Sequence, residues 1–311
     1  MNPPHLLSTP AVAMTIAGSD PIGGAGIQAD LKSFAACGVH GVTVITAIIA
    51  QNSSHVGRIL PVSPAMVRAQ IEMLTAESPP AALKTGALAT AAIVRCVAGA
   101  IAAQALPAPV IDPVMLSTSG ARLLDREGEE ALRSLLLPLA RVITPNLPEA
   151  AALSGIAITT PSAIREAVRV LHRLGARAVV IKGGHSLSGA AAAAGEGGAG
   201  ARMRARAALT KPRDGAGTAA RSRPIPLQHR LATDLFYDGR RFIELTAPRI
   251  PGNGAHGTGC AFSAALAAWL ARGADLERAV REAKRFVTAA LKHSYRLSAN
   301  GRPLLGHLTC E

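Results

Sequence analysis

The stretch His256-Gly257-Thr258-Gly259-Cys260 holds the residues of this chain whose types and spacing could best do chemistry. It leads into an alanine-rich segment, 261–271, that we predict to be a helix. The first turn of a helix has free backbone N–H groups and the positive end of the helix dipole, which is typical of an anion site. The same field favours a thiolate, so Cys260 is a candidate nucleophile or base near neutral pH. A glycine turn followed by a structural cysteine remains the alternative.

Further polar side chains stand at the ends of short apolar runs. These runs are continuously apolar, which is typical of strands covered on both faces, and we expect strands over 12–17, 42–50, 109–112, 141–144 and 178–182. Gln51 follows the second run, Asp112 ends the third, Asn146 and Glu149 follow the fourth, and Lys182 ends the fifth. Ligands of open α/β sheets bind outside the carboxyl ends of strands, so we expect these groups to converge on one crevice. Taken alone, Glu149 is also explained as a cap of the next helix.

Longer segments with helical periodicity alternate with the apolar runs. We expect helices over 25–37, 64–76, 91–104, 127–137, 161–174, 261–271 and 275–293. Pro64 directly after Ser63 indicates a helix start, and Gly38 indicates a helix end. Asp238-Gly239 indicates a hairpin turn between Phe236 and Phe242. Strands that alternate with helices predict an α/β fold with a parallel sheet wrapped by helices.

A glycine-rich loop follows the first expected strand and opens the first expected helix. The segment 17–26 reads Ala-Gly-Ser-Asp-Pro-Ile-Gly-Gly-Ala-Gly, which does not match the GxGxxG register, and the chain contains no GxxxxGK[ST] motif. Dinucleotide-binding and P-loop interpretations are therefore weak. Small residues still let a planar ligand approach the backbone closely, and Asp30 lies one helical turn further in.

The positive charge of the chain is concentrated in one segment. The formal net charge of the 311 residues is +13, and residues 186–232 contribute eight basic and two acidic side chains. The part from about 188 to 226 is rich in Ala, Gly and Arg and poor in large apolar residues, so we predict a flexible surface insertion in a single domain, 1–311. The remaining charge is spread thinly without interleaved aromatic residues, which argues against a nucleic-acid partner.

Composition also bears on compartment. No window approaches the roughly 20 apolar residues of a membrane span, and residues 1–10 lack the basic start of a signal peptide, so no membrane partner is expected. The four cysteines (Cys37, Cys96, Cys260 and Cys310) show no paired or CxxC spacing. That pattern disfavours a disulfide framework or a zinc site and fits the reducing cytoplasm.

Taken together, the motifs resemble a known family. The segments 15–21, 23–32, 46–52, 112–115, 144–150, 182–185 and 256–260 are similar, in order, to the hydroxymethylpyrimidine/phosphomethylpyrimidine kinases of thiamine biosynthesis, which belong to the ribokinase-like superfamily. The resemblance extends from about Val12 to His293, interrupted by the basic insertion. It implies a three-layer α/β/α sandwich with a mostly parallel central sheet. It also implies phosphorylation of 4-amino-5-hydroxymethyl-2-methylpyrimidine and of its monophosphate, with ATP and Mg²⁺.

The resemblance implies a role for each group of residues. The pyrimidine would lie near Gly18, with Asp30 and Gln51 hydrogen-bonding it and Ile49 and Val114 forming apolar walls. The backbone amides of Gly257, Thr258 and Gly259 would form the anion hole, and Cys260 would be the base. Asn146 and Glu149 match the NxxE element that helps to hold Mg²⁺, partly through water. Asp112 would share the metal and phosphate region, and Lys182 would neutralise nucleotide phosphate charge.

One departure from the family keeps alternatives open. Ala87 stands where these kinases usually carry a methionine, which widens the expected pyrimidine pocket. A pyridoxal or pyridoxine kinase of the same fold is therefore a second hypothesis. A non-catalytic relative that binds a ligand or nucleic acid is a third. The residues that argue against it are Asp112, Asn146, Glu149, Lys182 and Cys260. The resemblance also leads us to expect a homodimer.

Overall fold

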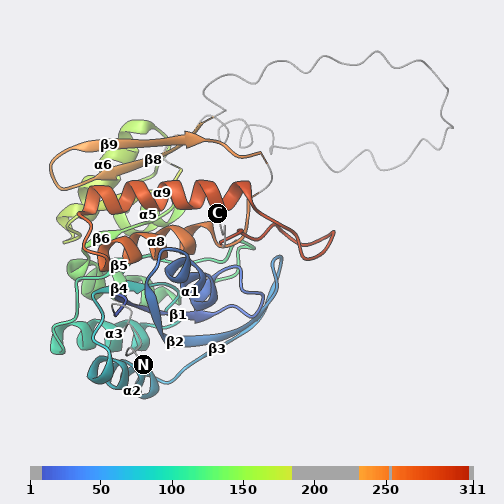
Figure 1. Ribbon diagram of the computed structural model, residues 1–311. Helices are drawn as coiled ribbons and strands as arrows, with labels where there is room; N and C mark the ends of the chain where they lie inside the picture. Colours follow the sequence, from blue (N-terminus) through green and yellow to red (C-terminus); the bar gives the residue numbers. More distant parts are fainter. Residues whose placement is uncertain (1–8, 184–230, 252–253, 308–311) are drawn as a thin grey trace, which may run out of the picture.

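One mixed sheet organises the molecule. The computed structural model describes residues 9–183, 231–251 and 254–307, so the predicted insertion at about 188–226 lies outside the described residues. Within these ranges one sheet has nine strands in the order β3-β2-β1-β4-β5-β6-β7-β8-β9. Their bounds are β1 Val12–Ser19, β2 His40–Gln51, β3 Val56–Pro61, β4 Ala82–Thr85, β5 Val110–Ile111, β6 Val142–Ile143, β7 Val179–Ile181, β8 Leu231–Tyr237 and β9 Phe242–Pro248 (Figure 1).

The direction of the strands changes only at the two sides of the sheet. β2, β1, β4, β5, β6 and β7 are parallel, whereas β3 pairs antiparallel with β2, and β8 and β9 form an antiparallel hairpin beside β7. The hairpin turn is the one that the sequence predicts, with Asp238 accepting hydrogen bonds from the amides of Arg240 and Arg241 and Gly239 at φ +95°.

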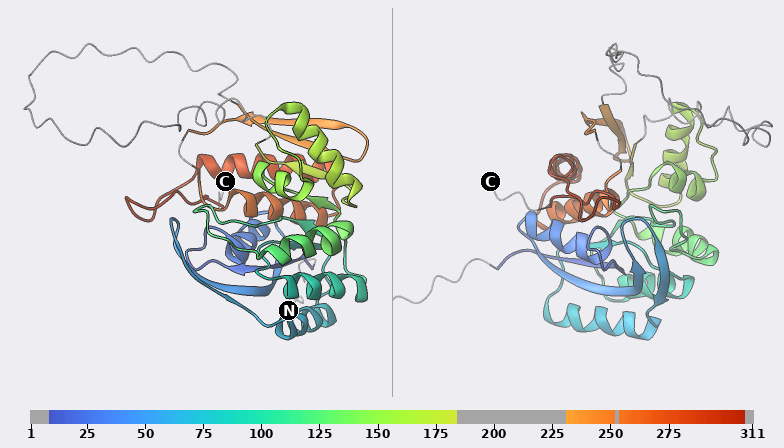
Figure 2. Two further views of the ribbon diagram at one scale, coloured as in Figure 1. Left: turned by 180° about the vertical axis from the view of Figure 1, so that it is seen from behind. Right: turned by 90° about the vertical axis from the view of Figure 1, so that its right-hand side faces the viewer.

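Helices cover both faces of the sheet. The helices are α1 Gly26–Ala36, α2 Pro64–Glu77, α3 Ala91–Ala103, α4 Arg126–Ala131, α5 Leu147–Ser154, α6 Pro161–Arg173, α8 Thr258–Ala271 and α9 Leu276–Lys292. Figure 2 shows α1, α8 and α9 on one face and the other helices on the opposite face. This mostly parallel sheet between two helical layers confirms the predicted α/β/α sandwich.

Side chains of the parallel strands alternate between two cores, as the twofold periodicity of a strand requires. Met14, Leu83 and Ile111 belong to the core under α3, whereas Ala13 and Val110 pack in the core under α1, α8 and α9. Both faces of each strand are therefore apolar, which is why the strands read as continuous apolar runs in the sequence.

Three elements were not predicted, and one helix differs from its prediction. β4 escapes detection because it is four residues long and contains Lys84, and β3 because its side chains are largely exposed. α5 was not predicted because it has only eight residues and carries Pro148 in its first turn. The helix expected over 127–137 is α-helical only to Ala131, and it continues as a π turn and a short 3₁₀ turn that contains Pro138.

Among the described residues, no helix has both the length and the apolar character that a membrane crossing requires. Three of the four cysteines lie in the described ranges, and all three are free thiols.

A buried ion pair lies at the centre of the sheet. The ammonium group of Lys84 on β4 donates to both carboxylate oxygens of Asp30 on α1, at 2.8 and 2.7 Å, and both side chains are fully buried. The hydroxyl of Thr15 on β1 donates to the same carboxylate at 2.6 Å. Removing one partner of such a pair leaves an uncompensated charge in the core.

We therefore expect Lys84→Met to lower the free energy of unfolding by about 3–5 kcal/mol, as measured by urea denaturation. The double variant Lys84→Met/Asp30→Leu recovers most of that loss, because it removes both charges together. As a control, Arg285→Ala breaks an exposed pair with Glu282 and costs less than about 1 kcal/mol. Equal losses in Lys84→Met and Arg285→Ala would contradict this account.

Candidate active site

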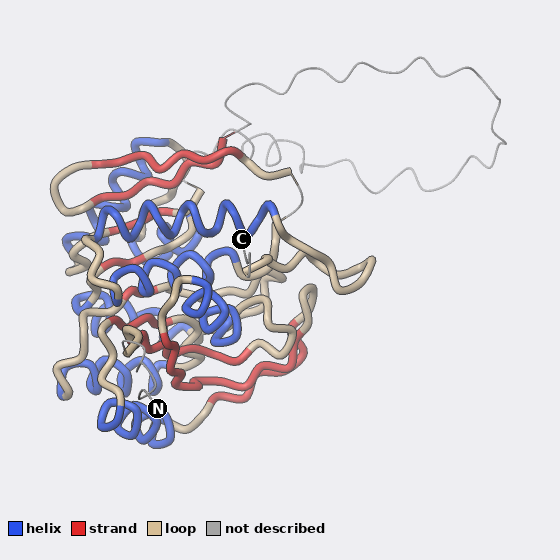
Figure 3. The backbone as a smooth tube through the Cα atoms, in the orientation of Figure 1, coloured by secondary structure: helices blue, strands red, loops and turns tan. Residues whose placement is uncertain are grey.

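The loops after several parallel strands and the turn before α8 meet at the carboxyl edge of the sheet (Figure 3). They surround a cavity of about 260 Å³, which we call the strand-end cavity. Its walls are formed by Ala25, Gln51, Asp112, Val114, Leu116, Ser117, Thr118, Leu123, Asn146, Glu149, Lys182, His256, Gly257, Thr258, Gly259 and Cys260. The convergence that the sequence predicts is therefore present for Gln51, Asp112, Asn146, Glu149 and Lys182.

The turn before α8, residues 256–260, is here called the anion turn. Gly257 has φ +84°, a left-handed conformation, and its carbonyl accepts the first helical hydrogen bond from Ala261 at 2.9 Å. α8 thus begins at Thr258, three residues before the predicted start, and the anion turn itself supplies the free amides of the first helical turn. A Cβ atom on Gly257 would lie 1.6 Å from the carbonyl oxygen of Gly24, so only glycine fits here.

An ion pair crosses the floor of the cavity. The ammonium group of Lys182 lies 2.8 Å from a carboxylate oxygen of Asp112, which is 2% exposed. The hydroxyls of Thr144 and Ser263 each lie 3.3 Å from the same carboxylate group. A Cβ atom on Gly259 would come within 2.9 Å of the Lys182 nitrogen, so the absence of a side chain at Gly259 admits the lysine to the helix start.

Asn146 and Glu149 form a capping box at the start of α5. The Asn146 side chain accepts from the amide of Glu149, and the Glu149 carboxylate accepts from the amide of Asn146, both at 2.9 Å. The capping explanation for Glu149 is thus correct, and the same carboxylate also faces the strand-end cavity.

The two carboxyl groups of the cavity differ in proton affinity. Burial and the neighbouring Asp112 raise the pKa of Glu149 to about 7, against the opposing effect of Lys182. Burial also raises the pKa of Asp112, but Lys182 and Lys84 outweigh it, so the pKa of Asp112 is below its usual range. Glu149 is therefore the carboxylate that lacks a full cationic partner.

The expectation that the helix start poises Cys260 near neutral pH is contradicted by the surroundings of its thiol. Burial raises the pKa of the Cys260 thiol to about 11, and the carboxylates Asp112 and Asp30 add to the rise. The Lys84 ammonium and the Gly26 amide act in the opposite direction without cancelling it. The low dielectric of the site and two nearby negative charges therefore outweigh the helix dipole.

Three of the predicted pyrimidine contacts do not line the cavity. Asp30 is fully buried and engaged by Lys84 and Thr15, so its carboxylate is not presented to a ligand. Ile49 is 5% exposed and packs with Ala47 and Leu123, and Gly18 is buried with the Ile49 side chain over it, 3.1 Å from where a Cβ would lie. Gln51 and Val114 do line the cavity, as predicted.

A second cavity of about 540 Å³ adjoins the first, and we call it the β9–α9 cavity. Lys182, Thr258 and Gly259 line both cavities, so the two meet at the anion turn. The β9–α9 cavity is further lined by Gly183, Ala232, Asp234, Pro248, Arg249, Ile250, Pro251, Gly254, Ala255, Phe262, Lys284, Val287, Thr288 and Leu291.

Sequence reasoning missed an ion pair in the β9–α9 cavity. Asp234 on β8 accepts from the amide of Gly183 and from the ammonium of Lys284 on α9, both at 2.7 Å. The available signal was an aspartate within a mostly apolar strand. The sequence also gave no role to Asp20 or His256, whose side chains meet at 3.0 Å behind the anion turn. Both stand in segments that carry the family resemblance, 15–21 and 256–260.

Comparison with known proteins identifies the family. The family model described as phosphomethylpyrimidine kinase matches residues 20–223 and 222–304. A hydroxymethylpyrimidine/phosphomethylpyrimidine kinase of Haemophilus influenzae is 41% identical over 93% of this chain and 94% of its own length.

Two solved structures share the fold. The pyridoxal kinase of Bacillus subtilis, solved as an ADP complex, is 36% identical with a TM-score of 0.75, over 96% of this chain and 97% of that one. A phosphomethylpyrimidine kinase of Clostridium difficile is 32% identical with a TM-score of 0.68, over 90% of this chain and 99% of that one. Sequence and architecture thus agree, and the chain belongs to the phosphomethylpyrimidine kinase family, whose members are kinases with a ribokinase-like fold.

Proposed function

We propose that the protein transfers the γ-phosphoryl group of ATP to 4-amino-5-hydroxymethyl-2-methylpyrimidine and then to the resulting monophosphate. The observation that carries this proposal is the meeting of two cavities at one anion turn, with Lys182, Thr258 and Gly259 common to both. A nucleotide in one cavity and an alcohol in the other would face each other across free backbone amides. That geometry is suited to in-line phosphoryl transfer, which depends mainly on positioning and charge stabilisation.

The β9–α9 cavity is the proposed nucleotide site. One part of its wall is apolar, with Ile250, Phe262 and Val287, which suits a nucleobase. Another part holds Lys182 and the anion turn, which suit phosphates. The ADP complex of the related Bacillus subtilis kinase supports the use of a nucleotide by this fold.

Mg²⁺ fits the donor set of the strand-end cavity. Two carboxylates, Asp112 and Glu149, face the same space, and the raised pKa of Glu149 indicates negative charge in excess of the nearby cations. Mg²⁺ commonly keeps several water and phosphate ligands, so one or two carboxylates are enough to hold it. Asn146 would orient Glu149 through the capping box. When bound, Mg²⁺ neutralises charge on the phosphate oxygens.

The proposed base is Cys260. In the fraction of molecules whose Cys260 is deprotonated, the substrate hydroxyl oxygen forms its bond to phosphorus, ADP leaves, and the hydroxyl proton passes to the Cys260 thiolate, which becomes a neutral thiol. The positive charge of Lys84 favours the thiolate, and the amides of Gly257, Thr258 and Gly259 stabilise the transferring phosphoryl group. Lys182 balances the charge that develops on the phosphates.

The proposed contacts to the acceptor ring are Gln51 and Val114. The side-chain amide of Gln51 can pair with the amino group and ring nitrogens of the pyrimidine, and Val114 offers an apolar wall. Pyridoxal is a second candidate acceptor. It is favoured by the small Ala87 side chain and by the likeness to a pyridoxal kinase.

We further propose a single domain that works as a homodimer in the cytoplasm. Ile48 and Leu60 face each other across β2 and β3 and are 57% and 56% exposed. This exposed apolar pair supports contact with a second copy of the chain.

The three free thiols suit a reducing compartment.

The Cys260→Ser variant tests the proposed base. In a coupled ADP-release assay with the pyrimidine, its monophosphate and pyridoxal, we expect kcat to fall by about 10²–10⁴-fold. The pKa of the Cys260 thiol is about 11, and below that pH the thiolate fraction grows about tenfold for each unit by which the pH rises. Wild-type kcat should therefore rise between pH 7 and pH 9. That rise should be absent in the variant.

Cys96→Ser is the matched control, because Cys96 lies on α3, outside both cavities, and its thiol contacts the carbonyl of Pro64. It should retain wild-type rates. Wild-type kcat in Cys260→Ser would contradict the assignment of the base, and a wild-type protein that releases no ADP with any acceptor would contradict the proposed function.

The pKa of Glu149 leads to a prediction about stability. The pKa of about 7 in the folded protein lies above the ordinary 4.5, so folding favours the protonated form. The stabilisation is complete below pH 4.5 and is lost as the pH rises through 7. Glu149→Gln keeps the capping oxygen without the charge, and it should stabilise the metal-free protein at pH 8 by up to about 3 kcal/mol.

Urea denaturation in the presence of a chelator measures this difference, which should nearly vanish at pH 5. The exposed Glu130→Gln is the control and should change the unfolding free energy by less than about 0.5 kcal/mol at both pH values. An equal effect of Glu149→Gln at both pH values would show that burial does not destabilise the ionised form of Glu149.

Leu60→Lys tests the proposed dimer. A charge opposite Ile48 in the centre of the exposed apolar pair should shift sedimentation from dimer to monomer. Met73→Lys, a control at an exposed apolar residue on α2, should leave the sedimentation unchanged. A wild-type protein that sediments as a monomer at micromolar concentration would contradict the dimer.

A further inference from the structure

Asp20 gathers hydrogen bonds from two distant parts of the chain. Its side chain is 1% exposed and lies in the glycine-rich loop after β1. Within that loop its carboxylate accepts from the amides of Ile22, Gly24 and Ala25, at 3.2, 3.1 and 2.7 Å. From the anion turn it faces the Nε2 atom of His256 at 3.0 Å. One carboxylate thus joins segments 236 residues apart.

His256 is itself held firmly. The residue is 6% exposed, and its backbone amide donates to the carbonyl of Pro303 at 2.9 Å. The Cδ2 edge of the ring packs on Gly24, where a Cβ atom would approach to 2.5 Å. Because Asp20 can only accept, the Nε2 atom of His256 carries the hydrogen of this contact.

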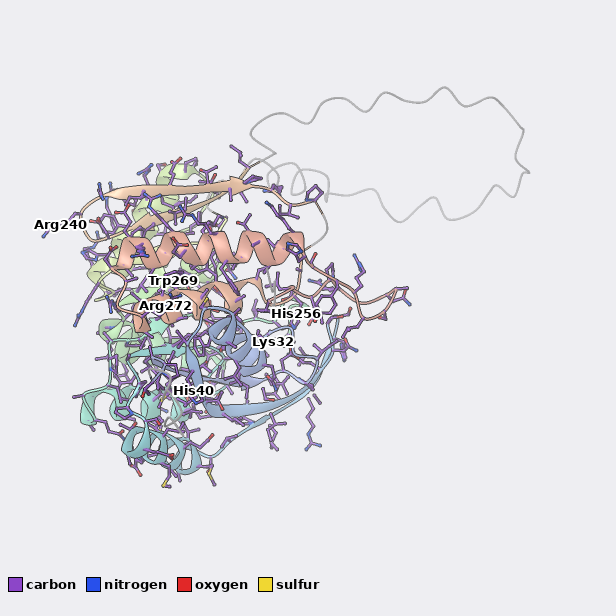
Figure 4. The ribbon with its side chains drawn as sticks, viewed as in Figure 1. Lys32, His40, Arg240, His256, Trp269 and Arg272 are labelled. Carbon is purple, nitrogen blue, oxygen red and sulfur yellow. The ribbon has the colours of Figure 1, made fainter. Side chains whose placement is uncertain are left out.

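The two loops touch through their backbones at the same place. The space for a Gly257 side chain is filled by the Gly24 carbonyl, and the next residue, Ala25, lines the strand-end cavity beside Cys260. A small movement of the glycine-rich loop would therefore shift the first amides of α8. Figure 4 labels His256 near the start of α8 and Lys32 on the neighbouring α1.

We propose that Asp20 is a positioning residue that holds the anion turn in register with the glycine-rich loop through the imidazole of His256. The inference rests on the proposed kinase function and deepens it. Asp20 is outside the lining of both cavities, so its effect on phosphoryl transfer runs through His256 and the loop amides.

The charge of Asp20 matters to this role. Burial raises its pKa, but hydrogen bonds from His256 and from the amide of Ala25 outweigh burial, so the pKa is below its usual range. The side-chain amide of Gln51 also favours the charged form. In Asp20→Asn the side-chain NH₂ group would face at least one of the N–H groups that now donate to the carboxylate. The substitution should therefore weaken the link between the glycine-rich loop and the anion turn while preserving side-chain volume.

A purely local role for Asp20 in shaping the glycine-rich loop is the competing explanation. Lys32 offers a matched control for it, because the Lys32 ammonium donates to the carbonyl of Gly23 at 2.7 Å and so holds the same loop without contacting the anion turn. Lys32→Met loosens the loop alone, whereas Asp20→Asn loosens both the loop and its connection to the turn.

The experiment measures kcat with the pyrimidine and, by calorimetry, the dissociation constant of ADP. We expect Asp20→Asn to lower kcat by about 30- to 100-fold, since displacements near 1 Å in a reacting site cost up to about 100-fold. ADP affinity should change by less than about threefold, because ADP lacks the phosphoryl group that the anion turn stabilises during transfer. Lys32→Met should lower kcat by less than about threefold.

Variants of His256 supply the rescue test. Glutamine can place a donor where Nε2 lies, so His256→Gln should stay within about fivefold of wild-type kcat, whereas His256→Leu should fall as far as Asp20→Asn. If both residues act through one contact, the double variant Asp20→Asn/His256→Leu is no more than about threefold worse than either single variant. Circular dichroism melts identify any variant that has failed to fold.

Three outcomes would overturn the positioning role: equal kcat in Asp20→Asn and Lys32→Met, equal kcat in His256→Gln and His256→Leu, or losses that multiply in the double variant. These outcomes are distinct from failure of the proposed function. In that case the wild-type protein itself would release no ADP with the pyrimidine.

Discussion

The balance of buried charges at the carboxyl edge of the sheet is the constraint on which the rest of the site depends. Asp30 on α1 is paired with Lys84 on β4, and Asp112 after β5 is paired with Lys182 after β7. Glu149 is a further buried carboxyl group, and its raised pKa reflects the lack of a cation of its own. Charges this deeply buried persist only with partners, so the site has a deficit that a divalent cation would offset.

A second constraint is the exclusion of side chains where backbones meet. The anion turn needs its amides to point into the cavity, and the Gly24 carbonyl already occupies the space beside Gly257. Gly259 leaves room for the Lys182 ammonium at the helix start in the same way. The glycines of the motif thus let a lysine, a carbonyl and free amides share a space that any Cβ atom would fill.

These constraints explain what could be predicted from the sequence. The sheet, most helices and the gathering of polar groups at strand ends follow from apolar runs and from parallel topology, both of which are local or general. The role suggested for Asp30 failed, because its pairing with Lys84 depends on β4, a four-residue strand with a buried lysine that no periodicity reveals. The contact of Asp20 with His256 could not be predicted either, because it joins residues 236 positions apart and leaves no spacing pattern in the sequence.

The proton affinity of Cys260 could not be predicted from the sequence, because it depends on charged residues far from it along the chain. That proton affinity nevertheless bears on the chemistry. A helix start alone favours a thiolate, whereas the assembled site, with Asp112 and Asp30 nearby, holds the thiol protonated at neutral pH. While it is neutral, the thiol adds no negative charge to a cavity that already contains Asp112 and Glu149, and only its small deprotonated fraction acts as the base. An aspartate base would repel an acceptor that carries a phosphate, at a cost that rises as the dielectric falls. A cysteine at this position therefore suits a site that must accept an alcohol first and its phosphate ester second.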